Sequence, residues 1–60
     1  MFDVYFYGPM RVILDNESGE VLGVQDRISG ASADFTFSPS YILEAKRFAQ
    51  RQYEASREYA

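Results

Sequence analysis

Residues 1–25 fall into three short apolar runs that turn-forming residues separate. The runs cover residues 2–7, 10–15 and 20–25, and each is rich in aromatic, β-branched or other large apolar side chains. Runs of this kind, bounded by Gly, Pro, Asn and Ser, are typical of strands in an antiparallel sheet. Residues 16–19 suit a tight hairpin loop, because Asn and Gly adopt the backbone angles that such loops need. Gly8-Pro9 is either a two-residue turn or a kink in one long strand.

The pattern changes after residue 25. Residues 26–34 hold mostly small and polar side chains without a period, which predicts a loop. Residues 35–37 alternate apolar, polar and apolar, which predicts a short fourth strand. From Ser38 onward the pattern is that of a helix, with Ser38 as its cap and Pro39 in its first turn, where the missing N–H costs nothing.

The helical segment separates into an apolar and a polar side at about 100° per residue. The apolar side comprises Tyr41, Ala45, Phe48, Ala49, Gln52, Ala55, Ser56 and Tyr59. The polar side comprises Glu44, Lys46, Arg47, Gln50, Arg51, Glu54, Arg57 and Glu58. Ile42 and Tyr53 lie on one shoulder of the apolar stripe, and Leu43 is a large apolar residue on the polar side. The sequence therefore predicts one α+β domain over residues 1–60, with a small antiparallel sheet of three or four strands packed against one C-terminal amphipathic helix.

Both faces of the predicted sheet are apolar. With tight turns at residues 8–9 and 16–19, the expected pairs are Tyr7–Met10, Val4–Ile13, Leu14–Val21 and Ile13–Leu22. One face, the Phe face, then carries Phe2, Val4, Phe6, Ile13, Leu22 and Val24. The other, the Tyr/Met face, carries Tyr5, Tyr7, Met10, Val12, Leu14 and Val21. One helix covers one face of such a sheet, so an apolar face is left over.

We expect the helix to cover the Phe face, because Phe has no polar atom to satisfy. The residues of the Tyr/Met face are then the predicted partner-binding residues, since Tyr and Met are enriched at protein interfaces. Two alternatives stay open. Residues 26–38 could fold back over the Tyr/Met face, or a slip of one residue in register could rearrange both faces.

Composition narrows the ways in which so short a chain is stabilised. Of its 60 residues 47% are apolar and 17% aromatic, and it has neither cysteine nor histidine. Disulfides and thiolate zinc sites are therefore excluded, and the commonest neutral metal ligand is absent. Because a small core without these supports is only marginally stable, we expect association with a second copy or with another protein. We expect no metal, cofactor or small-molecule substrate.

The sequence holds no residue set for catalysis. Nucleophile systems built on Ser with His, or on Cys, cannot form without His or Cys. Lys46 is expected on the solvent side of the helix, where nothing would lower its pKa. Three carboxylates, Asp15, Glu17 and Glu20, cluster at the second hairpin, where a solvated turn explains them. We therefore expect a protein that is not an enzyme.

The net charge of −3 is unevenly distributed. Four cationic residues of the helix are candidate contacts for an anionic partner: Lys46, Arg47, Arg51 and Arg57. The simpler interpretation is a solvated helix face balanced by Glu. An alternative function is binding of single-stranded nucleic acid or transcriptional regulation, with Tyr5 and Tyr7 stacking on bases beside Arg contacts. The acidic sheet region makes nucleic acid the less favoured partner.

No apolar run approaches the length needed to cross a bilayer, and the first residues lack a signal-peptide pattern, so we expect no membrane association and a cytoplasmic protein. Together these patterns predict a small protein-binding module that self-associates or docks a partner through the Tyr/Met face. Compact cysteine-free domains of this type fit adaptors or inhibitors, including those that phages and mobile elements encode.

Overall fold

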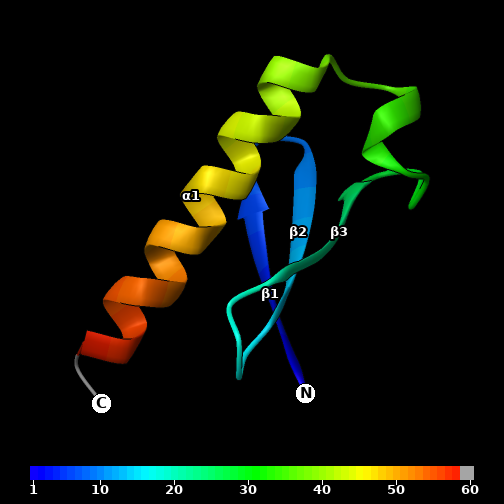
Figure 1. The fold of residues 1–60 in the computed structure, drawn as a ribbon. Helices are drawn as coiled ribbons and strands as arrows, with labels where there is room; N and C mark the ends of the chain where they lie inside the picture. The colour runs from blue at the N-terminus through cyan, green and yellow to red at the C-terminus, as the bar shows by residue number, and fades with distance from the viewer. Residues whose placement is uncertain (59–60) are drawn as a thin grey trace.

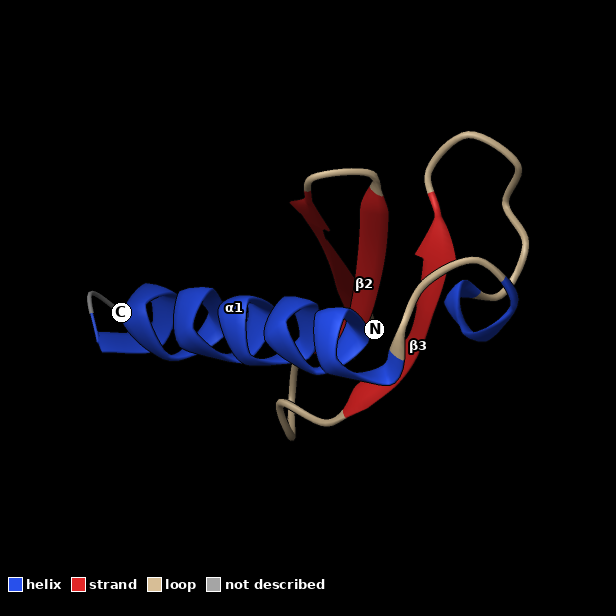
Figure 2. Ribbon diagram, turned by 90° about the horizontal axis from the view of Figure 1, so that it is seen from above, coloured by secondary structure: helices blue, strands red, loops and turns tan. Residues whose placement is uncertain are grey.

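The computed structural model describes residues 1–58 and consists of a sheet with one long helix packed on it (Figure 1). The strands are β1 (Phe2–Tyr7), β2 (Met10–Asp15) and β3 (Val21–Asp26), followed by a 3-10 turn, η1 (Ala33–Phe35), and helix α1 (Pro39–Glu58). The strands pair antiparallel in the order β1-β2-β3, so β2 is central. Helix α1 crosses one side of the sheet and contacts all three strands (Figure 2). The predicted α+β arrangement is confirmed.

Gly8-Pro9 is a two-residue turn and not a kink. Gly8 has a φ of 56°, and the ring of Pro9 fixes the φ of that residue at a negative value. A positive φ at the first central position, with Gly there, is the requirement of a type II′ hairpin turn. The predicted pairs Tyr7–Met10 and Val4–Ile13 form as expected.

The second hairpin closes as predicted, but a bulge follows it. The Gly19 N–H donates to the Asp15 carbonyl at 2.8 Å, with Gly19 at a φ of 78°. Leu14 pairs with Val21 as expected, whereas Ile13 pairs with Gly23 and leaves Leu22 as the extra residue. The predicted pair Ile13–Leu22 is therefore wrong. The extra residue shifts the alternation of β3, so Val24 lies opposite Val12 beneath the helix and not on the Phe face.

Residues 35–37 do not form the predicted fourth strand. The N–H groups of Thr36 and Phe37 both donate to the Ala33 carbonyl, at 3.0 and 2.9 Å, which closes the turn of η1. In the described segment between β3 and α1, pairing with the sheet is limited to one isolated bridge, in which Ser32 pairs with Gln25 of β3. Alternation over three residues carries too little information to outweigh this local bonding and the burial of Ala33 against the core.

Helix α1 begins where the sequence predicts. Ser38 accepts from the N–H of Tyr41 through Oγ at 3.4 Å and from the N–H of Ile42 through its carbonyl at 3.0 Å. Its buried line, however, runs through Ile42, Ala45, Ala49 and Tyr53. The predicted shoulder is thus the centre of the contact, and Gln52, Ala55 and Ser56 are exposed. The small Ala side chains let the helix approach β2 closely, while Tyr59 lies outside the described residues.

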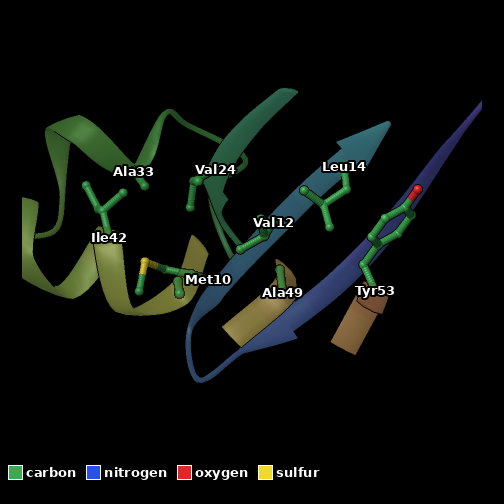
Figure 3. Close-up of a cluster of buried hydrophobic side chains, with 9 residues drawn as sticks. Met10, Val12, Leu14, Val24, Ala33, Ile42, Ala49 and Tyr53 are labelled. Atoms are coloured by element: carbon green, nitrogen blue, oxygen red, sulfur yellow. The ribbon is translucent and has the colours of Figure 1, made fainter. Parts of the chain in front are cut away.

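The core lies between α1 and the side of the sheet formed by the Tyr/Met face (Figure 3). Met10, Val12 and Leu14 project from β2 and are fully buried. Tyr53 lies across the far end of this row, and its hydroxyl donates to the Asn16 carbonyl at 3.0 Å. The expectation that the helix covers the Phe face is therefore wrong.

The central strand explains this choice of face. Arg11, Ile13 and Asp15 alternate with the three buried residues of β2, so they share the opposite side of the sheet. A helix on that side would remove two charges of the central strand from water, which costs several kcal/mol per ion without compensation. The charged residues on the inner side, Asp3 and Asp26, lie on the edge strands and stay half-exposed. Tyr5 and Tyr7 of the Tyr/Met face are only half-buried against the core, and covering part of a Tyr side chain is cheaper than burying a charge.

Candidate functional site

The side of the sheet turned away from α1 is an apolar surface with charges at its two ends. We call it the outer face and define it by register as Phe2, Val4 and Phe6 on β1, Arg11, Ile13 and Asp15 on β2, and Gly23 and Gln25 on β3. Phe2 is 61% exposed, Phe6 50% and Val4 39%. Leu22, at the bulge, is 57% exposed. Among the described residues, no other helix or strand covers this face (Figures 1 and 2).

Two arginines lie beside Phe6 at one end of the outer face. The guanidinium carbon of Arg27 lies 4.5 Å from the centre of the Phe6 ring, within the range of a cation–π contact. Arg27 also donates to the Gly8 carbonyl at 3.2 Å, which holds it over the first hairpin. Arg11, the register partner of Phe6, donates to the Gln25 side chain at 3.4 Å. This end of the face is cationic.

The opposite end of the outer face is anionic. Asp15 is the register partner of Phe2, and its Oδ1 accepts from the Glu17 N–H at 2.9 Å. That hydrogen bond is the main reason why the pKa of Asp15 is lowered from its ordinary value. Asp15 therefore carries a negative charge at neutral pH. The outer face thus has an apolar middle, a positive end and a negative end.

The predicted partner-binding residues form the core instead. Met10, Val12 and Leu14 are fully buried, while Tyr5, Tyr7 and Val21 are half-buried and packed against them. The Tyr7 ring lies 5.9 Å from that of Tyr41 and 5.2 Å from that of Phe48. Burial is also the largest cause of the raised pKa of Tyr5. The Tyr/Met face is covered mainly by α1. Residues 26–38 contribute at one side, where Ala33 is buried in the core and Phe37 packs against it.

The four cationic residues of the helix are not brought together. Arg47 and Arg51 line an open hollow of about 270 Å³ with Tyr7, Glu44 and Phe48. Lys46 lies on another side, half-buried, where it lines a groove of about 360 Å³ along β3 with Ile42 and Asp34. The expectation that Lys46 lies wholly on the solvent side is therefore wrong, because the helix is rotated toward its Ile42 shoulder.

Arg57 has a structural role that its sequence position did not reveal. Its Nη1 donates to the Tyr53 hydroxyl at 2.6 Å and to the Glu17 carbonyl at 3.3 Å. The guanidinium carbon also lies 5.5 Å from the centre of the Tyr53 ring. Arg57 and Tyr53 together fasten the last turns of α1 to the second hairpin. Arg57 is thus engaged within the chain and does not belong to a common cationic surface with Arg47 and Arg51.

The described residues also bear on metal binding and on insertion into a membrane. They contain no group of three or more His, Cys, Asp or Glu side chains placed to bind a metal ion. In the same part of the chain, no helix has the length and apolar character needed to span a membrane. Comparisons with protein-family models, with curated proteins and with solved structures give no significant match.

Proposed function

We propose that the chain is a non-enzymatic protein-binding module, of adaptor or inhibitor type, that docks a polypeptide against the outer face. The observation that carries this proposal is the exposure of Phe2, Val4 and Phe6 on a side of the sheet that no described element covers. Phe side chains are among the least favourable groups to leave in water, and a fold that leaves two on the same face of one strand gains most by covering them.

The size of the apolar patch supports a protein partner. The two Phe side chains expose roughly 200 Å², given that a Phe ring buries roughly 150–250 Å² when covered. Val4, Leu22 and the exposed part of Ile13 bring the apolar area to roughly 400 Å², within the size range in which patches are often functional. At about 25 cal/mol per Å², covering it contributes on the order of 10 kcal/mol, which is comparable to the cost of association.

The shape of the surface supports the same class of partner. A three-stranded face is broad and shallow, whereas pockets for small molecules are concave and enclose their ligand. Arg11 and Asp15 lie at opposite ends of the face, so a docked surface with complementary charges would be held in one orientation. A second polypeptide, presenting a sheet or a helix, fits both features.

Binding assays with matched variants test the proposal. Val4→Glu places a charge in the middle of the outer face. Val4 lies on an edge strand, where the backbone tolerates this substitution. Leu43→Glu is the matched control, since Leu43 is an exposed apolar residue on the helix, away from the outer face. We expect immobilised protein to retain a polypeptide partner from its host extract, Leu43→Glu to retain it, and Val4→Glu to lose it.

The variants must keep their fold for this comparison to be informative. Circular dichroism should show the same helix signal in both, because neither residue belongs to the core. Equal retention by Val4→Glu and the unchanged protein, with both folded, would contradict a docking role for the outer face. Loss of binding in Leu43→Glu alone would place the contact on α1 instead.

A second candidate function, binding of single-stranded nucleic acid, is favoured by one observation. Phe6 is half-exposed with Arg11 as its register partner and Arg27 over its ring, which joins a stacking surface to two cations. Tyr5 and Tyr7, the predicted stacking residues, are half-buried under α1 and cannot take that part. Titration of a labelled oligonucleotide at two salt concentrations tests this candidate. Salt-sensitive binding that Phe6→Ser abolishes would support it, and absence of binding at low salt would exclude it.

A further inference from the structure

We infer that the polypeptide on the outer face is a second copy of this chain, packed sheet against sheet about a two-fold axis that passes across the strands at Ile13. This inference rests on the proposed function, since it names the partner of the same face. It is carried by the arrangement of charges on the outer face, which is complementary to itself in one orientation.

The central strand sets the pattern. Arg11, Ile13 and Asp15 follow one another on the outer side of β2, so the cation and the anion lie on either side of a central apolar residue. Their Cα atoms are separated by roughly 13 Å, at about 3.3 Å per residue. A two-fold axis at Ile13, running between the two sheets and across the strands, reverses the strand direction of the second copy. Arg11 of each copy then faces Asp15 of the other, and Ile13 faces its own equivalent.

The edge strand has the same symmetry. Phe2 and Phe6 are the register partners of Asp15 and Arg11, and Val4 is the partner of Ile13. The same axis therefore places Phe2 of each copy against Phe6 of the other, and Val4 near its own equivalent. Phe2 and Phe6 are the most exposed side chains that β1 contributes to the outer face, and this arrangement covers both in each copy. A closed two-fold contact of this type uses one patch on both subunits and leaves no open end.

Other face-to-face orientations are less favourable. If the axis ran along the strands, β2 would pack parallel to its equivalent, with Arg11 against Arg11 and Asp15 against Asp15. Like charges in direct opposition are repulsive, so the charges select the antiparallel arrangement. The groups also have bonding capacity left. Asp15 uses Oδ1 for the Glu17 N–H, and the Arg11 guanidinium donates one bond to Gln25, out of five donors.

The area of the outer face sets the expected affinity. The strands have six residues each, so the face is about 20 Å long and, with its side chains, about 15 Å wide. Covering it removes on the order of 500 Å² per copy, or about 1,000 Å² in total, which is below the size of stable interfaces and typical of weak, transient ones. We therefore expect a dissociation constant of ~1–100 µM and a dimer that dissociates on dilution.

Charge reversal at Arg11 and Asp15 tests the arrangement. Arg11→Asp alone places Asp against Asp at both charge contacts of the dimer, and Asp15→Arg alone places Arg against Arg. In an equimolar mixture of the two variants, a mixed dimer again has an opposite charge at every contact. Sedimentation equilibrium should show dimers of the unchanged protein, at least tenfold weaker association of each variant alone, and recovery in the mixture.

Two controls separate folding from association. Asp15→Arg also removes the side-chain hydrogen bond from the Glu17 N–H within the second hairpin, so the helix signal of each variant is recorded by circular dichroism before sedimentation. Leu43→Glu, on the exposed side of α1, should dimerise like the unchanged protein. Recovery in the mixture itself reports folding, because two unfolded variants would not combine into a dimer.

The outcomes distinguish this inference from the proposed function. A monomer up to about 1 mM would overturn the second copy as partner, whereas retention of a different polypeptide that Val4→Glu abolishes would leave the proposed function standing. A dimer that Val4→Glu disrupts, but that neither charge reversal weakens, would overturn the two-fold arrangement at Ile13. A dimer indifferent to Val4→Glu would overturn the second copy as the partner of the outer face.

Discussion

Two leucines near each other in the sheet should differ sharply in their contribution to stability. Leu14 on β2 is fully buried under α1, whereas Leu22 at the bulge of β3 is 57% exposed. Replacing each with Ala removes the same atoms. Leu14→Ala leaves a cavity beside Val12 and Tyr53, while Leu22→Ala shortens a side chain that already contacts water. The pair therefore measures which side of the sheet the helix covers.

The magnitudes follow from burial. Leu→Ala at a buried position costs about 2–5 kcal/mol, which combines lost transfer free energy with the cavity left behind. A domain of this length has an unfolding free energy of roughly 3–9 kcal/mol, so Leu14→Ala should lose a large part of it. Leu22→Ala should cost less than about 1 kcal/mol, as is usual for exposed positions. The ratio between the two losses matters more than either value.

Urea denaturation followed by circular dichroism is the assay. Protein is kept at about 5 µM, so that association through the outer face adds at most about 1 kcal/mol to the apparent stability at the tightest dissociation constant expected. We expect a midpoint far lower for Leu14→Ala and nearly unchanged for Leu22→Ala, with similar slopes. A milder pair, Val12→Ala against Val4→Ala, covers the case in which Leu14→Ala is unfolded without urea. Equal losses within a pair, or the larger loss at the exposed position, would refute the placement of the core.

Three further predictions use matched or single changes. Gly19→Ala should cost most among three glycine variants, at least about 1 kcal/mol, because Gly19 has a φ of 78° and its added Cβ would lie 2.7 Å from the Tyr53 ring. Gly30→Ala should cost less, because Gly30 has a φ of 77° but its Cβ would lie in open space. Gly23→Ala should be neutral or stabilising, because Gly23 has no positive φ and nothing lies within 4 Å of the added Cβ. The three midpoints in urea falling in any other order would contradict the geometry. Tyr53→Phe removes the hydroxyl between Asn16 and Arg57 and should cost about 0.5–1.5 kcal/mol, with Tyr41→Phe as a control expected to lose less. The folded pKa of Asp15 is lowered below its ordinary value of 3.8, so the contribution of Asp15 to stability is complete above that value and is lost as the pH falls through the folded pKa. In urea denaturations at a series of pH values, the unfolding free energy of Asp15→Asn should therefore fall less steeply at acid pH than that of the unchanged protein. An equal fall in both proteins would show that the Glu17 hydrogen bond does not act in this way.

The elements of the fold could be predicted because their signals are local. Gly8-Pro9 and residues 16–19 have the chemistry that their turns require, and Ser38-Pro39 marks the start of α1. The same locality explains the failure at residues 35–37, where three alternating residues fit a strand but the hydrogen bonds to Ala33 form a turn. Gly23 was a weak sign of the bulge, since an isolated Gly in a strand often marks one, but it did not say which residue is extra.

The choice of buried face was mispredicted, although the sequence held a stronger signal. Comparing Phe with Tyr weighed only the polar atoms of β1, and Tyr hydroxyls can reach the margin of a core. The charges of the central strand decide the matter, because Arg11 and Asp15 share a side with Ile13 and their burial is expensive. The rotation of α1 toward Ile42 and Tyr53 could not be read from periodicity alone. It depends on the close fit of Ala45 and Ala49 against β2, which is a tertiary contact.

Nuclear magnetic resonance with a soluble paramagnetic agent tests most directly whether the outer face is open in the monomer and covered on association. In dilute protein, we expect the agent to broaden the side-chain signals of Phe2, Val4 and Phe6 strongly and to leave those of Val12 and Leu14 sharp. In concentrated protein, the broadening of Val4 should decrease while that of Leu43 on the helix persists. Strong broadening of Val12 in dilute protein, or no change at Val4 on concentration while Leu43 becomes protected, would contradict the assignment of the outer face as the contact surface.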